Sequence, residues 1–522
     1  MAARKKTKPR KASPGKGEDA EKRSGTGPAA KPEAPPPGAD LMGMEEAVAL
    51  LKTTRATFYR WLRGGKIKGF KAGRQWRFER AEIERFLKGE EPQLELPVSI
   101  EPLVKSLVRR AAKLGVQDLA EPEKADLGNA MDLIINLAVA MRASDIHIEP
   151  FPTAPGAETV GVLRYRVDGV LHPLAEFDLR LIPALVERFK AAAGCDVREK
   201  IKPQDGRILL DAGDHKLDLR LSFVGPTMGE SVTVRILDPR AVLLNLANID
   251  YTARDRERLM RNIRSPWGLV LVTGPTGCGK TTVLYACLNE LAGPDVKTMS
   301  LEDPVEFMLP WVTQIGIHPS KGLTFERGIR AVLRSDPDVI LVGEIRNRET
   351  LTVCQQAALT GHMVMTTLHT DEAASALKRM VEIGSEPFVV AEATRMVVAQ
   401  RLVRKLCPKC SRPQQPSEET LRHAAELARS GGLGWDSLKA AFRGPTGCSE
   451  CGQTGFKGRT VITEVLEITA EIGRALRAEA SVDEIRSIAV SQGMTTMAAD
   501  GIRRAAGGQV VLMEVLQILG LR

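Results

Sequence analysis

The stretch that decides the fold runs from Gly268 to Thr281 and reads GLVLVTGPTGCGKT. Its first six residues have the apolar pattern of a buried strand, and a helical segment follows Lys280. Residues 274–281 match G-x-x-x-x-G-K-[ST], a loop in which glycines let backbone N–H groups close on phosphate oxygens at a helix N-terminus. In such loops the lysine pairs with the β- and γ-phosphates, and the last hydroxyl binds Mg²⁺. The sequence therefore predicts a nucleotide site formed by Gly274, Pro275, Thr276, Gly277, Cys278, Gly279, Lys280, Thr281 and Thr282.

Two further segments place acidic residues at the ends of predicted strands. Residues 336–344, DPDVILVGE, end at Glu344, where a P-loop NTPase positions a carboxylate near Mg²⁺ and its water. Residues 301–306, LEDPVE, follow a strand-like run. They hold three carboxylates, Glu302, Asp303 and Glu306. Such carboxylates can polarise an attacking water as a general base, and a solvated loop explains the same spacing equally well.

Two histidines flank a later apolar run, residues 363–367. His362 precedes this run and His369 follows it. A histidine after a strand of this kind of fold can sense the γ-phosphate through a hydrogen bond. A purely structural role explains either histidine as well.

The positive charge is concentrated at the N-terminal end. The 522 residues carry a net charge of +9. Residues 1–40 have ten Lys/Arg and five Asp/Glu, and residues 41–88 have twelve and five, so these segments carry +5 and +7. Together they exceed the total by three, which leaves −3 for the other 434 residues. This asymmetry predicts an anionic partner for the N-terminal end only, and it disfavours a DNA-threading pore in the rest.

Two absences in the sequence indicate the compartment. No apolar run reaches the roughly 18 residues that a membrane-spanning helix needs. The start, MAARKKTKPRK, lacks the apolar core of a secretory signal. We therefore expect a cytoplasmic protein without a transmembrane segment of its own.

Four of the eight cysteines form two C-x-x-C pairs, with 37 residues between the inner cysteines. They are Cys407, Cys410, Cys448 and Cys451. In a chain without a signal peptide such pairs indicate metal ligands before disulfides. Four thiolates suit a closed tetrahedral Zn²⁺ site, which is structural because no coordination position stays open. Free or redox-active thiols are the alternative.

Composition and periodicity divide the chain into six segments. Residues 1–40 lack the apolar residues needed for a core, which predicts disorder. In residues 241–405 strands and helices alternate. The expected segments are a basic tail (1–40), a small helical domain with a hairpin (41–89), a linker with one helix (90–125), an α+β domain (126–240), a P-loop domain (241–405) and a cysteine-containing, mainly helical end (406–522). In the α+β domain we expect strands near 160–174, 207–211, 215–223 and 230–237.

The segments GPTGCGKTT, LEDPVEF, DPDVILVGEIRNRET and TGHMVMTTLHT stand in the order and spacing of Walker A, Asp-box, Walker B and His-box motifs. Together with ASDIHIEP and KPQDGRI upstream and GMTTMAADGIRRAAGGQVVLMEVLQIL downstream, they make about residues 126–522 resemble the ATPases of type II secretion and type IV pilus assembly. The resemblance implies an α/β fold, with a PAS-like α+β domain before a RecA-like core. It also implies a ring of six subunits, with ATP and Mg²⁺ at the P-loop.

The same resemblance assigns roles to single residues. The implied site residues are the catalytic base Glu306 with Glu302 and Asp303 beside it, the Walker B carboxylate Glu344, the His-box histidines His362 and His369, and Arg207 and Arg220, which match arginines that reach nucleotide from the preceding domain. Arg235 is a third candidate arginine, and surface ion pairing is the alternative for Arg207 and Arg220. The chain departs from the family at Asn347, where Asp is common, and at Cys278, where we expect packing. The cysteine pairs resemble those of assembly ATPases, which retraction ATPases usually lack.

Residues 53–87 resemble the excisionase/MerR-like winged helix-turn-helix, whose second helix enters the major groove. On this reading Arg55, Thr57, Arg60 and Lys66 face DNA, Arg74, Gln75 and Arg77 lie on the wing, and Phe58, Trp61, Leu62, Trp76 and Phe78 form the core. The charge of +7 favours nucleic acid. Docking on a protein explains the same domain, because a fold does not determine a function.

The whole pattern predicts a hexameric ATPase that converts ATP hydrolysis into mechanical work. Its output is the assembly of a type II secretion pseudopilus or a type IV pilus, through platform proteins at the inner membrane. The alternative is a DNA-associated ATPase or DNA-binding regulator, for example in DNA uptake.

Overall fold

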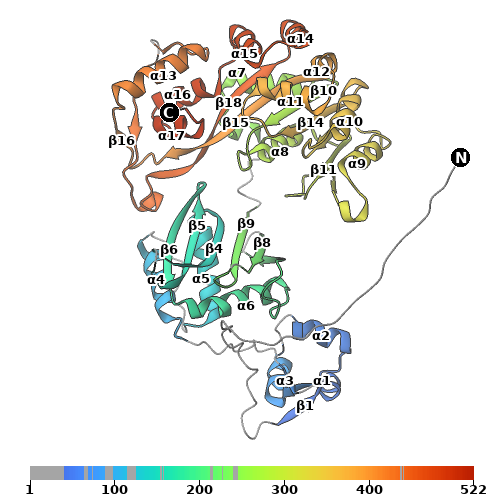
Figure 1. Ribbon diagram of the computed structural model, residues 1–522, viewed down its shortest axis with the longest axis vertical. Coiled ribbons are helices and arrows are strands. Elements are labelled where there is room, and N and C mark those ends of the chain that lie inside the picture. The colour runs from blue at the N-terminus through green and yellow to red at the C-terminus, as the bar shows by residue number, and fades with distance from the viewer. Residues whose placement is uncertain are drawn as a thin grey trace, which may run out of the picture. The chain divides into compact units, whose positions relative to one another are not determined.

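The computed structural model describes residues 40–63, 67, 69–72, 75–88, 98–113, 125–152, 154, 156, 158–211, 216–225, 227–238, 245–435, 438 and 440–521. The chain divides into two compact units, Met1–Gln93 and Leu94–Arg522 (Figure 1). Residues 1–39 of the expected disordered tail lie outside the described residues, as do Lys66 of the expected DNA-facing set and Arg74 of the expected wing.

The first unit combines short helices with a small antiparallel sheet of strand order β1-β3-β2. Its elements are β1 (Leu41–Gly43), α1 (Met44–Leu50), α2 (Arg55–Arg63), β2 (Phe70–Ala72), β3 (Gln75–Glu79) and α3 (Arg80–Leu87). Phe58, Leu62 and Phe78 are buried in its core, as the sequence predicted. Trp61 and Trp76 are half-buried, and Trp61 packs on the ring of Phe86.

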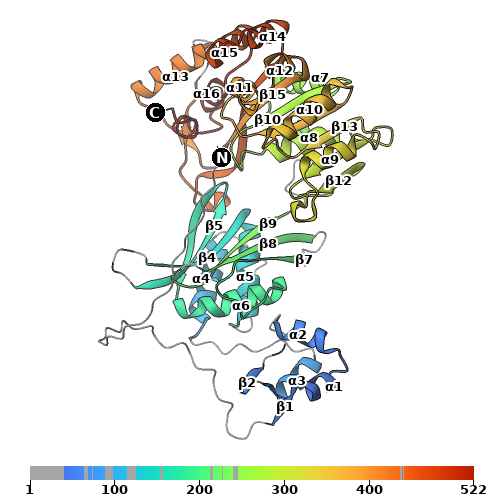
Figure 2. The same cartoon turned by 45° about the vertical axis from the view of Figure 1, so that its right-hand side comes forward.

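The second unit begins with an α+β part. Its elements are α4 (Glu101–Lys113), α5 (Leu127–Ala140), β4 (Ala143–Pro152), β5 (Thr159–Val167), β6 (Val170–Phe177), α6 (Ile182–Ala193), β7 (Gln204–Asp211), β8 (Lys216–Val224) and β9 (Ser231–Leu237). The strands form an antiparallel sheet of order β6-β5-β4-β9-β8-β7. Alternate residues such as Ile146 and Leu219 form one core with residues of the helices. The helices α4, α5 and α6 lie against this sheet (Figure 2). Residues of the opposite alternation, such as Arg220 and Arg235, therefore point away from this core.

The strand expected near 160–174 is a hairpin of two strands. β5 ends at Val167 and β6 begins at Val170. Asp168 and Gly169 between them have φ angles of 49° and 91°. Two successive left-handed residues suit a tight hairpin turn, because this turn matches the twist of the strands.

Residues 245–521 are built around a seven-stranded sheet of order β12-β11-β13-β14-β10-β15-β18. In chain order, the elements from α7 to β15 are α7 (Ala253–Ile263), β10 (Gly268–Thr273), α8 (Lys280–Leu291), β11 (Thr298–Glu302), β12 (Val312–Gly316), α9 (Phe325–Val332), β13 (Val339–Val342), α10 (Arg348–Leu359), β14 (Met363–Leu368), α11 (Ala373–Ile383), α12 (Pro387–Ala393) and β15 (Thr394–Leu406). These strands pair in parallel. The carboxyl ends of these strands therefore lie along one side of the sheet, called the carboxyl edge below, which is where open α/β sheets bind ligands.

Helices cover both faces of this sheet (Figure 1). Val270 and Val272 of β10 join a core with Leu284 of α8. Leu269 and Leu271 of the same strand join a different core with residues of α9 to α12. Burial on both faces explains why β10 is apolar throughout rather than alternating.

The C-terminal region returns to the same sheet. Its elements are β16 (Arg412–Pro413), α13 (Glu418–Ser430), β17 (Arg443–Gly444), β18 (Phe456–Glu467), α14 (Ala470–Arg477), α15 (Val482–Ser491), α16 (Met497–Ala506) and α17 (Leu512–Ile518). β18 pairs antiparallel with β15 and forms the edge of the sheet. Among the described residues, no helix is long and apolar enough to cross a membrane.

Candidate nucleotide and metal sites

The P-loop connects β10 to α8 at the carboxyl edge of the sheet. Gly274, Gly277 and Gly279 have φ angles of 147°, 78° and 91°, a region that side chains disfavour. A Cβ atom on Gly274 would lie 2.6 Å from the Cys278 sulfur and 2.6 Å from the Gln400 carbonyl. The glycines thus permit a compact loop whose amides lead into the N-terminus of α8.

Two loop side chains are held by their surroundings. The Lys280 ammonium donates to the carbonyls of Gly274 and Pro275 at 2.7 and 3.1 Å. Burial lowers the pKa of Lys280. The Cys278 side chain is buried, as expected, and burial raises the pKa of its thiol. Cys278 is therefore a packing residue of the loop rather than an exposed nucleophile.

A cavity of about 420 Å³ opens beside the P-loop. Five of the eight expected catalytic residues line it, together with Thr276, Lys280 and Thr281 of the P-loop. Its polar lining residues are Thr276, Lys280, Thr281, Tyr285, Glu302, Asp303, Glu306, Glu344, Arg346, Thr367 and His369. The fold therefore brings the acidic segments after β11 and β13 to the phosphate-binding loop.

Glu344 lies two residues after β13 and is paired twice. Arg346 donates to one carboxylate oxygen from its Nε at 2.7 Å, and the His369 Nε2 lies 3.2 Å from the other. Burial alone would raise the pKa of Glu344, but Arg346 and His369 lower it below its usual value. Glu344 is thus held ionised, as a ligand of a Mg²⁺ shell must be.

Glu302 ends β11 and is buried, with 4% of its surface exposed. The hydroxyls of Tyr285 and Ser300 and the amide of Gln314 all donate to its carboxylate. Asp303 is more exposed and lies 3.8 Å from an Arg346 nitrogen.

Glu306 belongs to the loop between β11 and β12 and meets an arginine of the α+β part. The Arg220 Nη1 lies 2.9 Å from the Glu306 carboxylate, and its Nη2 donates to the Val305 carbonyl at 3.3 Å. The Glu306 amide donates to the Tyr285 hydroxyl at 3.2 Å. Its position is therefore fixed from the P-loop helix and from β8.

The three candidate arginines form one row across neighbouring strands. Arg207 faces Arg220, and Arg220 faces Arg235. All three line a cavity of about 1200 Å³ together with residues 304–308. Carboxylates orient the outer two, since Asp218 binds Arg207 through two hydrogen bonds of 2.6 and 3.0 Å and Asp145 lies 3.0 Å from Arg235. A row of arginines directed at one cavity can bind an anionic phosphate group.

His362 lies apart from this constellation. It precedes β14, whereas the P-loop follows the parallel strand β10, so the two lie at opposite edges of the sheet. The His362 Nδ1 hydrogen-bonds the Ala357 carbonyl at 2.9 Å, which ties it to the end of α10.

Asn347 caps a helix. Its side-chain oxygen accepts from the Thr350 amide at 3.0 Å, at the start of α10. Asn and Asp cap helices about equally well. The departure from Asp at this position therefore leaves the cap intact.

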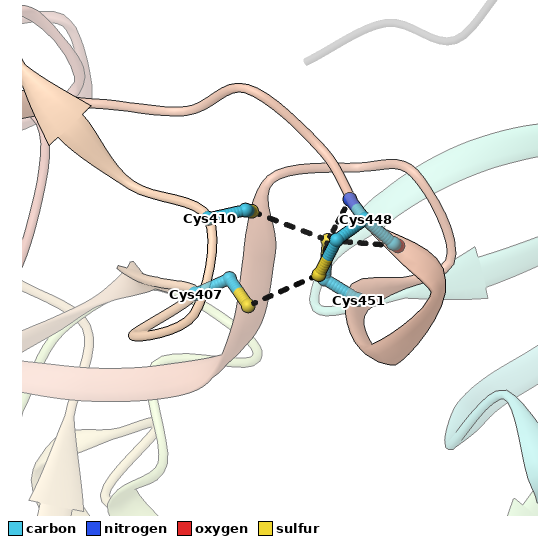
Figure 3. Close-up of side chains that lie close together, drawn as sticks. All are labelled: Cys407, Cys410, Cys448 and Cys451. Carbon is cyan, nitrogen blue, oxygen red and sulfur yellow. Dashed lines mark hydrogen bonds between the residues drawn. The ribbon is translucent and has the colours of Figure 1, made fainter.

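The four paired cysteines converge on one point (Figure 3). The sulfur atoms of Cys407 and Cys448 are 3.8 Å apart, those of Cys410 and Cys451 are 3.7 Å apart, and all four lie within 4.8 Å of one another. A tetrahedral site with Zn–S bonds of about 2.3 Å separates its sulfurs by about 3.8 Å. The donor set therefore fits Zn²⁺.

Backbone amides support the cluster. The amide of Gly447 donates to the Cys410 sulfur at 3.3 Å, and the amide of Gly455 donates to the Cys451 sulfur at 3.2 Å. Burial acts to raise the pKa of Cys410, but the Gly447 amide and neighbouring side chains lower it to about 7. Amide donors of this kind favour thiolates, which are the metal-binding form.

Three residues that contact the site carboxylates were not predicted from the sequence. Tyr285 and Gln314 carry no motif, and only the fold brings them to Glu302. Arg346 follows Glu344 by two residues, so proximity in the sequence was the available signal.

A P-loop followed by parallel strands that end in carboxylates defines a RecA-like NTPase. Comparison with known sequences gives the family. The family profile described as type II/IV secretion system protein matches residues 121–517, and one described as helix-turn-helix domain matches residues 41–91. The chain therefore belongs to the family of type II secretion and type IV pilus assembly ATPases and carries an N-terminal helix-turn-helix domain.

Individual relatives agree with this placement. The chain is 40% identical to type II secretion system protein E of Pseudomonas aeruginosa over 404 residues, which cover 77% of each protein. It is 38% identical to the type IV pilus assembly ATPase PilB of Thermus thermophilus, over 79% of this chain but 45% of that protein.

A solved structure supports the fold. The ATPase DotB of Yersinia pseudotuberculosis aligns with a TM-score of 0.56 at 18% identity, over 77% of this chain and 96% of that one. The predicted fold class, an α+β domain before a RecA-like sheet with a four-cysteine cluster, is confirmed.

Proposed function

We propose that this chain hydrolyses ATP and works as a homo-hexameric ring that drives assembly of a secretion pseudopilus or a type IV pilus. The observation that carries the proposal is the meeting of the P-loop, Glu344, Glu306 and Arg220 at one cavity edge. Phosphoryl transfer needs positioned phosphates, a carboxylate near the attacking water and positive charge on the transferred group. These residues supply all three.

Each residue has a separate task in this proposal. Lys280 and the loop amides bind the phosphates, and Glu306 accepts a proton from the attacking water. Thr281 and Glu344 would hold Mg²⁺, which would supply positive charge to the phosphate oxygens. Glu302 and Asp303 stand beside Glu306, and His369 orients Glu344.

The arginine row has a further task. We propose that Arg220, Arg207 and Arg235 present positive charge to the nucleotide from the α+β part. We propose no phosphate contact for His362, because it lies before β14, at the amino ends of the parallel strands.

Steady-state hydrolysis tests the enzymatic core of the proposal. The wild type should hydrolyse Mg-ATP, and Glu306→Gln should bind ATP but turn over roughly 10²- to 10⁴-fold more slowly, the usual contribution of a general base. Glu382→Gln is the matched control, since Glu382 is exposed and pairs with Arg379 on α11. A wild type without activity, or a fully active Glu306→Gln variant, would contradict the proposal.

We also propose a structural Zn²⁺ held by Cys407, Cys410, Cys448 and Cys451. This ion would have no open coordination position, because all four of its ligands come from the protein. Metal analysis of the purified protein should give about one zinc per chain. Full folding and activity without any metal would contradict this assignment.

The cellular setting follows from the family. We propose that the ring is cytoplasmic, associates peripherally with the inner membrane and acts on platform proteins there. Light scattering with a non-hydrolysable ATP analogue should report a mass near six chains, and a stable monomer under all nucleotide conditions would contradict the ring.

The helix-turn-helix unit supports a second candidate function, duplex DNA binding. Arg55 and Arg60 are exposed on α2, which has no acidic residue, and neither forms an ion pair within the described residues. Two arginines of α3 are paired instead, Arg80 with Asp40 and Arg85 with Glu82. An unneutralised basic helix is the footprint of a nucleic-acid site. Docking on a protein remains the competing use of the same surface.

Binding of a fluorescent duplex at several salt concentrations separates the two uses. DNA binding predicts an affinity that falls steeply with salt, and its loss in the Arg55→Ala/Arg60→Ala double variant. It also predicts hydrolysis that responds to DNA. No binding at low salt and an unchanged rate would leave the unit as a protein-docking domain.

A further inference from the structure

The loop that carries Glu306 spans residues 303–311 between β11 and β12 and has no helix or strand of its own. Loops of this kind are mobile unless other groups hold them. A general base must nevertheless stay within hydrogen-bond reach of its water. The residues that hold this loop therefore decide how well the base is positioned.

Two side chains bind the loop backbone at three places. The Tyr285 hydroxyl accepts a hydrogen bond of 3.2 Å from the Glu306 amide. The Gln314 side chain accepts the Leu309 amide at 2.6 Å and donates to the Phe307 carbonyl at 2.9 Å. The loop is thus fastened on both sides of Phe307, directly after the base.

Both side chains are themselves fixed by Glu302. Its carboxylate accepts from the Tyr285 hydroxyl on one oxygen and from Gln314 at 3.1 Å on the other. The Ser300 hydroxyl adds a further donor at 2.5 Å. A carboxylate that is only 4% exposed and already accepts three hydrogen bonds is poorly placed to accept a proton from water, and well placed to orient its donors.

We propose that Tyr285, Glu302 and Gln314 form a buried clamp that positions Glu306, and that Tyr285 is its link to the P-loop helix. This inference rests on the proposed ATP hydrolysis. Tyr285 stands five residues after Lys280 on α8. A shift of that helix on phosphate binding therefore moves the amide of the base with it. The clamp makes Tyr285 a positioning residue, since its hydroxyl contacts the Glu302 carboxylate and the Glu306 amide.

The protonation of Tyr285 is consistent with this role. Burial, followed by the Glu302 carboxylate, raises the pKa of Tyr285 well above its usual value. The phenol therefore keeps its proton at physiological pH and donates a hydrogen bond to Glu302. Its oxygen stays free to accept a hydrogen bond from the Glu306 amide.

The test is Tyr285→Phe in the full chain, which removes one oxygen atom. We expect kcat to fall roughly 10- to 100-fold, the effect of a catalytic group misplaced by about 1 Å. KM and the affinity for a non-hydrolysable ATP analogue should change less than about threefold, because no phosphate contact is lost. Hydrogen exchange at the backbone of residues 303–311 should become faster, which reports the released loop without any turnover.

Tyr165→Phe is the matched control. Tyr165 is fully buried in the α+β part, and its hydroxyl donates to the Ile134 carbonyl at 2.6 Å. It loses a comparable buried hydrogen bond and should keep kcat and the exchange of the loop. Gln314→Met is the second variant should Tyr285→Phe fold poorly, and the same fall in kcat is expected.

The outcomes are distinguishable. Equal kcat and equal loop exchange in Tyr285→Phe and wild type would overturn the clamp while leaving Glu306-dependent hydrolysis standing. Equal losses in Tyr285→Phe and Tyr165→Phe would reduce the clamp to general stability and overturn it too. A wild type without Glu306-dependent hydrolysis would overturn the proposed function and this inference with it.

Discussion

The phosphate-binding edge and the cysteine cluster of the same unit are assembled by different means. The cluster takes its donors from two local C-x-x-C turns, and each pair is separated by only two residues. The phosphate-binding edge takes Lys280, Glu306, Glu344 and Arg220 from four different segments between residues 220 and 344. The first arrangement depends on two local turns and, as proposed, on a metal, whereas the second depends on the register of two sheets.

This difference has an energetic consequence. If the four thiolates bind the proposed Zn²⁺, the cluster gains its stability from the metal rather than from the surrounding core. The nucleotide site instead gains precision from buried neighbours such as Tyr285 and Glu302, which belong to the core. Damage to one region should therefore leave the other intact, and variants can test this independence.

The largest effect is expected at the metal. In Cys407→Ser/Cys410→Ser the site loses two of four ligands, and the zinc should fall from about one equivalent to none. Structural zinc sites contribute roughly 10–16 kcal/mol of apparent binding free energy, so residues 407–456 should become sensitive to protease. Metal analysis and limited proteolysis measure this, with ATP-analogue binding as the independent readout. Loss of nucleotide binding as well would break the separation of the two regions.

The reverse variant is Lys280→Ala. Removal of the ammonium from the phosphate loop should slow hydrolysis by roughly 10²- to 10³-fold or more and weaken ATP binding. Zinc content and protease resistance of residues 407–456 should match the wild type. Phosphate release assays and metal analysis on the same preparation check both halves, and a zinc-depleted Lys280→Ala protein would show that the regions are coupled.

A smaller effect is expected at the arginine row. Arg220 contacts the Glu306 carboxylate directly, so Arg220→Ala should lower kcat by about 10- to 100-fold through a misplaced base. Arg207 is 63% exposed and paired with Asp218, so Arg207→Ala should have a weaker effect, with turnover reduced more than ATP affinity. Steady-state kinetics and analogue binding separate the two. Unchanged turnover in Arg207→Ala would exclude that residue from hydrolysis.

The smallest effect concerns acid stability of the phosphate-binding edge. The pKa of Glu344 is lowered below its usual 4.5, so its ion pairs stabilise the fold above that pH and this contribution is lost as pH falls through the folded-state value. Thermal unfolding of wild type and Glu344→Gln should therefore converge below about pH 4.5. The difference should stay below about 1 kcal/mol, because the pair is partly solvated. A stability difference between the two proteins that grows as the pH falls would contradict this prediction.

The sequence predicted those elements whose sequence pattern is local. The strand before Gly274 and the helix after it follow from an apolar run and a phosphate loop that need no distant partner to be recognised. The cysteine cluster followed from spacing for the same reason. The hairpin at Asp168 was merged into one strand, because its two-residue turn has no proline and only one glycine to mark it.

By itself, then, the sequence determined the P-loop, the carboxylates that follow β11 and β13, the metal donors and the family. Only the tertiary structure decided that Arg220 meets Glu306, that Glu302 is buried under three donors, and that His362 lies at the opposite edge from the P-loop. It also placed β18, which follows the cysteine pairs, at the edge of the RecA-like sheet. The physical reason is that a motif records which residue types are present, whereas a contact between distant segments depends on strand order and register.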